Sequence, residues 1–317
     1  MASFLFLAQM QPKEYIFSYN ASQNNFVGKT TEAEKPPLNI LFLGIAGEGS
    51  RGQFLTDAIL IIHLNLSQKK IALISIPRDL WVQIPNRSQK IKINGLYDLE
   101  NKDKPFSQAT NSNLIRQKIE EITGLTINHT AILELEGFGK LIDAIGGIDI
   151  WLAEDISDPL LVNPHNPSEI FHLAAGWRHL DGDLAIKFVR TRYAPEGDFY
   201  RMQNQQQIIA ALKNKLAELA DVWNLTTWLK IWQSLNKHVI TDLNFNTLWQ
   251  IFNLVKDIPV DQIEYIKITN RPPDQLLQTV TFTDGSEGEY IYALIPRQGF
   301  EQYQQIQNYI KEKISTQ

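Results

Sequence analysis

The chain has 317 residues, of which 44% are hydrophobic and 21% charged, values typical of folded globular proteins rather than disordered or fibrous ones. A formal net charge of −5 argues against a generally basic surface for nucleic acid, so we expect no nucleic-acid partner. The absence of cysteine excludes disulfides, zinc ribbons, iron–sulfur clusters and thiol catalysis, and it favours an extracytoplasmic location.

The first 37 residues are predicted to form a polar stalk. They are rich in Asn, Gln, Ser and Thr and end at Glu34-Lys35-Pro36-Pro37, a composition typical of tethers. The apolar run Ala2–Ala8 is too short for a membrane helix, which needs about 20 residues. We therefore expect a stalk over residues 1–37, one folded domain over residues 38–317, and no membrane anchor within this chain.

The remaining chain alternates strand-like and helix-like segments. The predicted strands are Leu38–Gly44, Asp57–Leu66, Lys70–Ile76, Thr130–Leu135, Ile148–Leu152, Ile263–Thr269, Thr279–Phe282 and Tyr290–Ile295. The predicted helices are Asn113–Thr123, Gly137–Ile145, Asp181–Val189, Asp198–Leu219, Leu225–Lys237, Phe245–Lys256 and Phe300–Ile314. The segment Asp155–Ser168 contains three prolines and is predicted to be a loop. Strands mixed with helices predict an α/β fold with a mixed sheet.

A glycine-rich loop follows the first predicted strand. Residues Gly47 to Gly52 match the G-x-G-x-x-G pattern of dinucleotide-binding proteins. Such a site also needs a following helix and an acidic residue about 20 positions on. Residues 54–66 are predicted as a strand instead, and Gln68, Lys69 and Lys70 stand where the acid should be. The sequence therefore argues against a nucleotide fold.

Two aspartates are predicted to meet at one end of a hairpin. If the chain turns near Ser67-Gln68, Asp57 at the start of one strand lies across from Asp79 just beyond the other. Two neighbouring carboxylates repel unless a cation lies between them, and oxygen ligands suit Mg²⁺. The alternative is that one aspartate caps a strand and the other stabilises a turn.

A second group of charged residues surrounds the start of the predicted helix Asp198–Leu219. Asp198, Arg201 and Gln205 share one helix face near the N-terminus, where anions bind favourably. Arg190 and Arg192 come from the end of the preceding helix. Guanidinium groups match phosphate oxygens, so the three arginines predict a phosphate or pyrophosphate site. Alternatively, Asp198 caps the helix and pairs with Arg201 while the other arginines are solvated.

The seven tryptophans and the apolar helix faces after Leu212 permit two interpretations. They form either an ordinary core or the wall of a lipid groove, and the sequence does not separate the two.

Residues 38–215 carry an ordered series of motifs. These are Asn39–Gly44, Thr56–Leu60, Ile74–Asp79, Lys92–Asn94 with Tyr97, Gly137-Phe138, Leu141–Ile148, Gly176 with Leu180–Gly182, Ala185, Phe188–Arg192, Gly197–Arg201 and Gln205-Gln206. The series resembles the LytR-CpsA-Psr family of bacterial cell-wall phosphotransferases. It departs from the family pattern at Leu55-Thr56, at Asn204 and at Asp98–Glu100, which leaves the glycan donor and acceptor open.

The resemblance implies a three-layer α/β/α sandwich with a mixed central sheet and a hydrophobic groove for a polyprenyl chain. It implies an enzyme that transfers a glycopolymer from a polyprenyl-pyrophosphate carrier to a peptidoglycan hydroxyl, with Mg²⁺ or Mn²⁺. Arg78, Arg190, Arg192 and Arg201 would clamp the pyrophosphate. Asp57 and Asp79 would bind the metal, Asp198 and Gln205 would orient the clamp or the acceptor hydroxyl, and Lys92 and Asn94 would help to bind substrate.

The family's usual setting implies an extracytoplasmic protein of the cell envelope, monomeric and working at the membrane surface. Its members are normally tethered by an N-terminal transmembrane helix. Two alternatives use the same site: a regulatory protein that binds polyprenyl phosphates without turnover, and a pyrophosphatase that uses water as acceptor. The sequence does not distinguish the pyrophosphatase from the transferase.

Overall fold

The structure is a computed structural model that describes residues 36–50, 52–65, 67–163, 166–194, 197–220, 228, 231–233, 235–283 and 290–315. The expected stalk lies almost wholly outside the described residues, as do six of the thirteen residues of the expected helix Leu225–Lys237. No helix in the described ranges is long and apolar enough to cross a membrane.

A six-stranded mixed sheet forms the centre of the fold. Its strands, in spatial order, are β11 (Val239–Thr241), β6 (His129–Glu134), β1 (Leu38–Ile45), β2 (Thr56–Asn65), β3 (Lys70–Ser75) and β12 (Ile263–Lys267). The pairs β1–β6 and β3–β12 are parallel, whereas β1–β2, β2–β3 and β6–β11 are antiparallel. The expected hairpin and the expected mixed sheet are therefore both confirmed.

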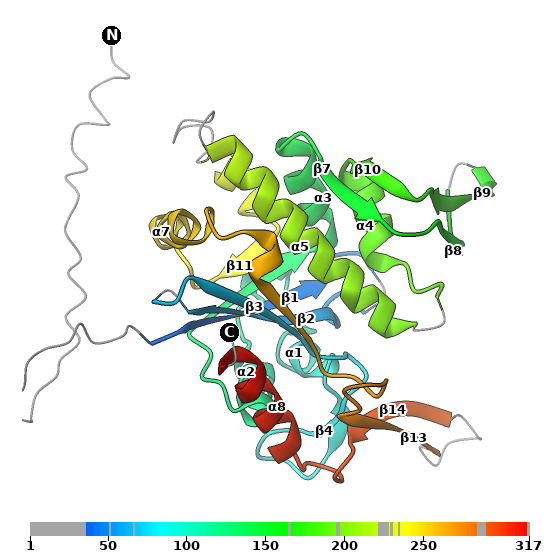
Figure 1. Cartoon of the computed structure of the whole chain (residues 1–317). Coiled ribbons are helices and arrows are strands. Elements are labelled where there is room, and N and C mark those ends of the chain that lie inside the picture. The colour runs from blue at the N-terminus through cyan, green and yellow to red at the C-terminus, as the bar shows by residue number, and fades with distance from the viewer. Residues whose placement is uncertain are drawn as a thin grey trace, which may run out of the picture. The chain divides into compact units, whose positions relative to one another are not determined.

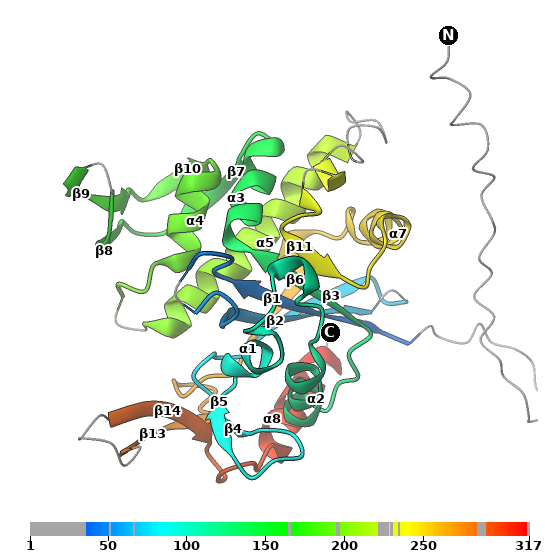
Figure 2. The same ribbon diagram turned by 180° about the vertical axis from the view of Figure 1, so that it is seen from behind.

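Helices cover both faces of this sheet (Figures 1 and 2). One face carries α1 (Gly95–Asn101), α2 (Asn113–Thr123) and α8 (Gln304–Ser315). The other carries α3 (Leu135–Ala144), α4 (Gly182–Arg190), α5 (Asp198–Ala220) and α7 (Phe245–Val255). This arrangement is the expected three-layer α/β/α sandwich.

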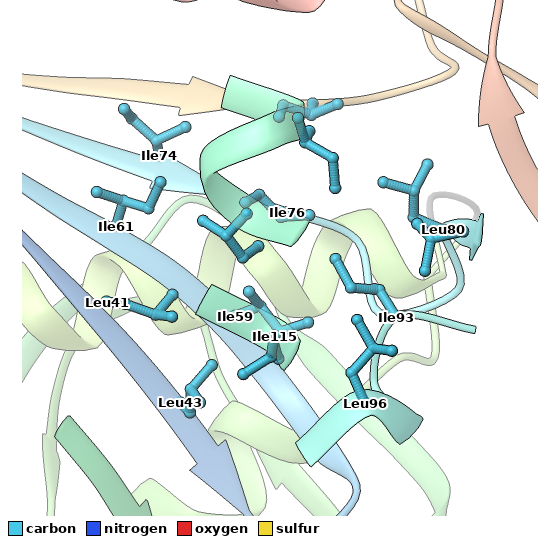
Figure 3. Packing of buried hydrophobic residues seen from close by; sticks show 14 of the residues in the cluster. Leu41, Leu43, Ile59, Ile61, Ile74, Ile76, Leu80, Ile93, Leu96 and Ile115 are labelled. Atoms are coloured by element: carbon cyan, nitrogen blue, oxygen red, sulfur yellow. The ribbon is translucent and has the colours of Figure 1, made fainter. Parts of the chain in front are cut away.

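The alternation of side chains along the strands explains the two covered faces. Leu41 and Ile61 point to the layer of α1, α2 and α8, where they join a large buried cluster with Ile115 (Figure 3). Ile40 and Leu60, one position earlier on the same strands, join a second cluster with residues of α7. Because both faces of the sheet are covered, the sequences of these strands are continuous apolar runs and do not alternate between apolar and polar residues.

Local signals set the ends of several helices where the sequence predicts them. The α2 helix stops at Gly124, whose φ of 71° is left-handed and favours glycine. The α4 helix begins after Asp181, whose carboxylate accepts a hydrogen bond from the amide of Leu184. By contrast, α8 begins at Gln304 rather than at the predicted Phe300.

The predicted loop Asp155–Ser168 is wrong. The chain there forms β8 (Ile156–Asn163) and β9 (Asn166–Leu173), which pair as an antiparallel hairpin. The register shifts between Asp158 and Val162, the stretch that contains Pro159, so the proline occupies an irregularity that needs no ladder hydrogen bond there. The bulge accommodates Pro159, so a proline in this segment does not exclude a strand.

The other missed elements are the helix α1 and several short strands. The pairs β4 (Trp81–Gln83) with β5 (Lys90–Lys92) and β7 (Ile148–Leu152) with β10 (Gly176–Leu180) are two-stranded. Of these four strands the sequence predicts only β7. The two remaining predicted strands are confirmed as β13 (Leu277–Thr283) and β14 (Tyr290–Pro296), and they form an antiparallel pair.

A buried histidine makes the stability of this fold depend on pH. His63 on β2 is 5% exposed, and its Nδ1 lies 2.7 Å from Asn39 Oδ1. Burial lowers the pKa of His63 below its ordinary value. The unfolded chain therefore binds the proton more readily, and the free energy of unfolding should decrease as the pH falls from 7 to 5. We expect His63→Gln to weaken this dependence, as measured by urea denaturation at both pH values; an unchanged pH slope would assign it to other groups.

Candidate active site

The β2–β3 hairpin brings Asp57, Arg78 and Asp79 together at one edge of the sheet. Leu60 pairs with Ser75, and the amide of Ile76 donates to the carbonyl of Ile59, so Asp57 faces the turn that follows β3. Nη1 of Arg78 donates to the Asp57 carboxylate, and its Nε lies 3.8 Å from Asp79. The Arg78 guanidinium therefore lies between the two aspartates.

The first turn of α5 adds Asp198 and Arg201 to this cluster. Asp198 Oδ1 lies 2.7 Å from Nη2 of Arg201 and 3.5 Å from Nε of Arg78. Nη2 of Arg201 also donates to the main-chain carbonyl of Asp57, at 3.0 Å. Arg201 is only 6% exposed, and its contacts with Asp198 and Asp57 hold the start of α5 against the start of β2.

Burial controls the electrostatics of the α5 pair. It lowers the pKa of Arg201 to about 10, against the opposing charge of Asp198, so the guanidinium stays protonated at neutral pH. Burial also raises the pKa of Asp198, although Arg201 and Arg78 oppose that effect. Arg192 contributes to both shifts, which places its charge within electrostatic reach of the cluster.

Several polar atoms of the cluster are buried without a hydrogen bond among the described residues. They are Nε of Arg78, Nε of Arg201 and both carboxylate oxygens of Asp198. Buried polar atoms in native proteins are nearly always hydrogen-bonded, and exceptions concentrate where a ligand or ion is missing from the structure. The cluster therefore has donor and acceptor capacity left for a ligand.

Lys92 and Asn94 reach the cluster from β5 and the turn after it. Lys92 Nζ lies 2.6 Å from Asp79 Oδ1. The main-chain carbonyl of Asn94 accepts from the amide and hydroxyl of Thr56, and its amide donates to the carbonyl of Arg78. The backbone of Asn94 thus connects β2 to the turn that carries Arg78. This positioning contact is separate from the substrate binding that the resemblance implies for Asn94.

Arg190 and Arg192 lie at the exposed end of α4. The segment between them is held by Asp158 of β8, which accepts from Thr191 Oγ1 at 2.6 Å and from the amide of Arg192 at 3.3 Å. The structure therefore brings Arg78 and Arg201 together through Asp198 and places the charge of Arg192 within electrostatic reach of that pair, whereas Arg190, the last residue of α4, forms no ion pair among the described residues.

Gln205 and its neighbour Gln206 have different environments on α5. Gln205 is half-buried on the helix that carries Asp198 and Arg201. Gln206 is buried and donates to the carbonyl of Leu73, to Ser75 Oγ and to the carbonyl of Ile266, so it fastens α5 to β3 and β12. Sequence reasoning missed this role of Gln206 and the role of Asp158, because neither has a local pattern that marks it.

The carboxylates of the cluster fit a metal that arrives with its substrate. No group of three metal-ligating side chains occurs within the described residues. Mg²⁺, however, is commonly held by one or two carboxylates together with substrate phosphates. Asp57 and Asp79 offer such oxygens, and the Asp198 carboxylate, which is ion-paired with Arg201 and Arg78, lies beside them.

The ion pairs of the cluster leave it without net charge. Asp57, Asp79 and Asp198 are balanced by Arg78, Lys92 and Arg201, with which they form ion pairs. Extra positive charge for an anionic ligand must then come from Arg192, from Arg190 or from a bound cation.

This fold and this site define an α/β protein with a buried arginine–aspartate cluster at a sheet edge, a class suited to phosphorylated ligands. The chain matches the model of the LytR_cpsA_psr family over residues 8–297, and it belongs to that family. The resemblance inferred from the motifs is confirmed.

Its relatives include teichoic acid transferases. The chain is 30% identical over 235 residues to polyisoprenyl-teichoic acid–peptidoglycan teichoic acid transferase TagU of Bacillus mycoides (strain KBAB4), which covers 74% of this chain and 68% of that protein. It is 25% identical over 260 residues to TagV of Bacillus subtilis (strain 168), over 80% of this chain and 62% of TagV. Among solved structures, B. subtilis TagV superposes with a TM-score of 0.67 at 22% identity, over 89% of this chain and 99% of that one. TagT bound to LI-WTA superposes with a TM-score of 0.61 at 20% identity, over 89% and 90%.

Proposed function

We propose that this protein transfers a glycopolymer from a polyprenyl-pyrophosphate carrier to a hydroxyl group of peptidoglycan. The observation that carries the proposal is the cluster of Arg78, Arg201 and Asp198, largely shielded from solvent, in which both guanidinium groups keep an Nε–H without a hydrogen bond among the described residues. Relatives named as teichoic acid transferases support the same reaction class. The protein would act at the membrane surface on the outer side of the cell envelope, as a monomer.

The reaction forms one bond and breaks one. The acceptor hydroxyl oxygen attacks the glycan-side phosphorus, and the bond from that phosphorus to the bridging oxygen breaks. Polyprenyl monophosphate leaves with the bridging oxygen, and the hydroxyl proton passes to a neighbouring base or to water. Phosphoryl transfer depends mainly on positioning and charge neutralisation, which the arginines of the cluster supply.

Each charged residue has a place in this scheme. Arg78, Arg201 and Arg192 bind the pyrophosphate oxygens, with Arg190 completing the clamp from the end of α4. Asp198 orients Arg78 and Arg201, with which it is paired in the structure. Gln205, farther along the same helix, orients the acceptor hydroxyl.

A divalent cation, Mg²⁺ or Mn²⁺, would be held by Asp57 and Asp79. When bound, it neutralises negative charge on the pyrophosphate. We expect a chelator to abolish turnover and added Mg²⁺ or Mn²⁺ to restore it, measured as release of polyprenyl monophosphate. Full activity in excess chelator would contradict the metal role, and Asp57→Asn should raise the Mg²⁺ concentration needed for half-maximal rate.

The polyprenyl chain needs an apolar surface, and the layer of α5 and α7 provides a candidate. The α7 helix buries none of its residues fully, although most of them are apolar. Trp228, Trp249 and Phe252 form an aromatic cluster there, with ring centroids 5.4 to 5.9 Å apart. Such partly covered apolar side chains support the hydrophobic groove expected from the family.

A transfer assay tests the proposal directly. The full chain is incubated with a glycan labelled on its polyprenyl-pyrophosphate carrier and with peptidoglycan. Label in peptidoglycan, matched by an equal amount of polyprenyl monophosphate, is the expected result. Label released only as soluble glycan phosphate would instead indicate a pyrophosphatase, and tight lipid binding without any product would indicate a regulatory binder.

A further inference from the structure

A cavity lies beside the arginine–aspartate cluster and is not accounted for by it. It has a volume of about 390 Å³, within the range typical of small-molecule sites. The polar residues that line it include Glu48, Ser107, Glu134, Glu136, Lys237 and His238. They come from the loop after β1, from the segment that follows α1, from the β6–α3 junction and from the segment before β11.

Glu134 forms the floor of this cavity. It is 6% exposed, and its Oε1 accepts a hydrogen bond from the amide of Glu48 at 3.0 Å. Its Oε2 lies 3.0 Å from Nδ1 of His238, which donates to it. A buried carboxylate is costly unless it is paired in this way, so the two partners fix its position.

The glycine-rich loop is shaped by this carboxylate. Gly47 has a φ of 93°, and a Cβ added there would lie 2.9 Å from Glu134 Oε1. Only glycine combines this left-handed backbone with so close an approach. The G-x-G pattern that fails as a nucleotide motif is thus explained at Gly47 by the wall of the cavity.

The strand register places the cavity near the transfer site. Ile45 of β1 pairs with Glu134 of β6 on one side and with Thr56 of β2 on the other. Neighbouring strands lie about 4.8 Å apart, so Glu134 is about 10 Å from Thr56, which precedes Asp57. A glycan whose reacting end lies at the cluster can therefore extend into the cavity.

The charges in the cavity indicate what it can bind. The lining carries three carboxylates, of Glu48, Glu134 and Glu136, and one ammonium group, of Lys237, beside the imidazole of His238. Lys140 adds a second ammonium group, 2.7 Å from Glu136 Oε1 and 2.8 Å from Nε2 of His238. The remaining excess of one negative charge disfavours a second phosphate group. Carboxylates accept hydrogen bonds from hydroxyl groups, and the exposed Pro105 offers apolar surface to the carbon face of a ring.

We propose that this cavity binds a hydroxyl-bearing sugar residue of one of the two glycans that take part in the transfer. The role of the sugar as part of a transfer substrate rests on the proposed function, whereas its binding does not. The cavity then holds the glycan in register with the cluster, and the Glu134–His238 pair supplies its fixed hydrogen-bond acceptor.

The test uses a variant that closes the cavity from its rim. Ser107 is exposed, so Ser107→Trp adds a bulky ring at the entrance without disturbing the buried pair. Ser88 is exposed on a different turn and provides the matched control Ser88→Trp. A soluble peptidoglycan glycan fragment is titrated into each full-length protein by calorimetry, and the KM of the lipid-linked glycan is measured in the transfer assay.

We expect Ser107→Trp either to weaken binding of the glycan fragment or to raise the KM of the lipid-linked glycan. The expected change is about tenfold or more, equivalent to about 1.4 kcal/mol, and Ser88→Trp should change neither value. A change confined to the glycan fragment assigns the sugar to the acceptor, and a change confined to the KM of the lipid-linked glycan assigns it to the donor. Unchanged values for both would overturn the inference. A different result separates the two proposals. If the wild-type protein transfers no glycan but binds the fragment, and Ser107→Trp weakens that binding, the proposed function fails and the sugar site stands.

Discussion

Arg78→Ala is expected to lower the rate of glycan transfer by about 10²- to 10³-fold, because it removes a charged donor from the centre of the site. Arg78 pairs with Asp57 and lies close to Asp79 and Asp198. Its loss therefore removes a phosphate ligand and leaves Asp57 without its ion-pair partner, as a carboxylate that repels an incoming pyrophosphate. The measurement is kcat and KM for the lipid-linked glycan, with release of polyprenyl monophosphate as readout.

Two further variants show whether the lower rate comes from the missing Arg78 guanidinium. Arg78→Lys keeps the charge but cannot bridge two carboxylates with a planar fork, so we expect it to recover only part of the rate. Arg87→Ala removes an exposed arginine elsewhere and should keep wild-type activity. Wild-type activity in Arg78→Ala would remove the basis for placing the pyrophosphate at this cluster.

The centre of the site was predictable because its geometry follows from local patterns. The turn at Ser67-Gln68 fixes the hairpin register, and that register places Asp57 opposite the Arg78–Asp79 turn. The spacing of Asp198 and Arg201 puts them on one helix face, where they form an ion pair. What spacing did not reveal is that Arg78 itself lies between the aspartates.

The missed features depend on contacts between distant parts of the chain. Glu134 and His238 are 104 residues apart, and no periodicity links a strand end to the segment before β11. Asp158 holds Thr191 from within a hairpin whose prolines read as a loop. Gln206 resembles its neighbour Gln205 in sequence, and only the packing of α5 on β3 and β12 shows that one is buried. Such roles are set by tertiary packing and not by local propensity.

Arg201 is expected to be required for stability and for activity, and the two requirements can be separated. Its side chain is 6% exposed and joins the Asp198 carboxylate to the Asp57 carbonyl. Removal of one partner from a buried ion pair leaves an uncompensated charge, at a cost of about 3 kcal/mol or more. We therefore expect Arg201→Ala to lower the free energy of unfolding by about that amount in urea denaturation and to lower the transfer rate at least about 10²-fold.

The double variant Asp198→Ala with Arg201→Ala distinguishes the two effects. Because it removes both charges, it should be more stable than the Arg201→Ala single variant, and the double-mutant cycle should give a coupling free energy between the two residues. Its transfer rate should stay as low as that of the single variant, because the pyrophosphate ligand is still missing. Transfer that returned together with stability would mean that Arg201 only holds α5 in place, and the phosphate clamp would then consist of Arg78 and the arginines at the end of α4.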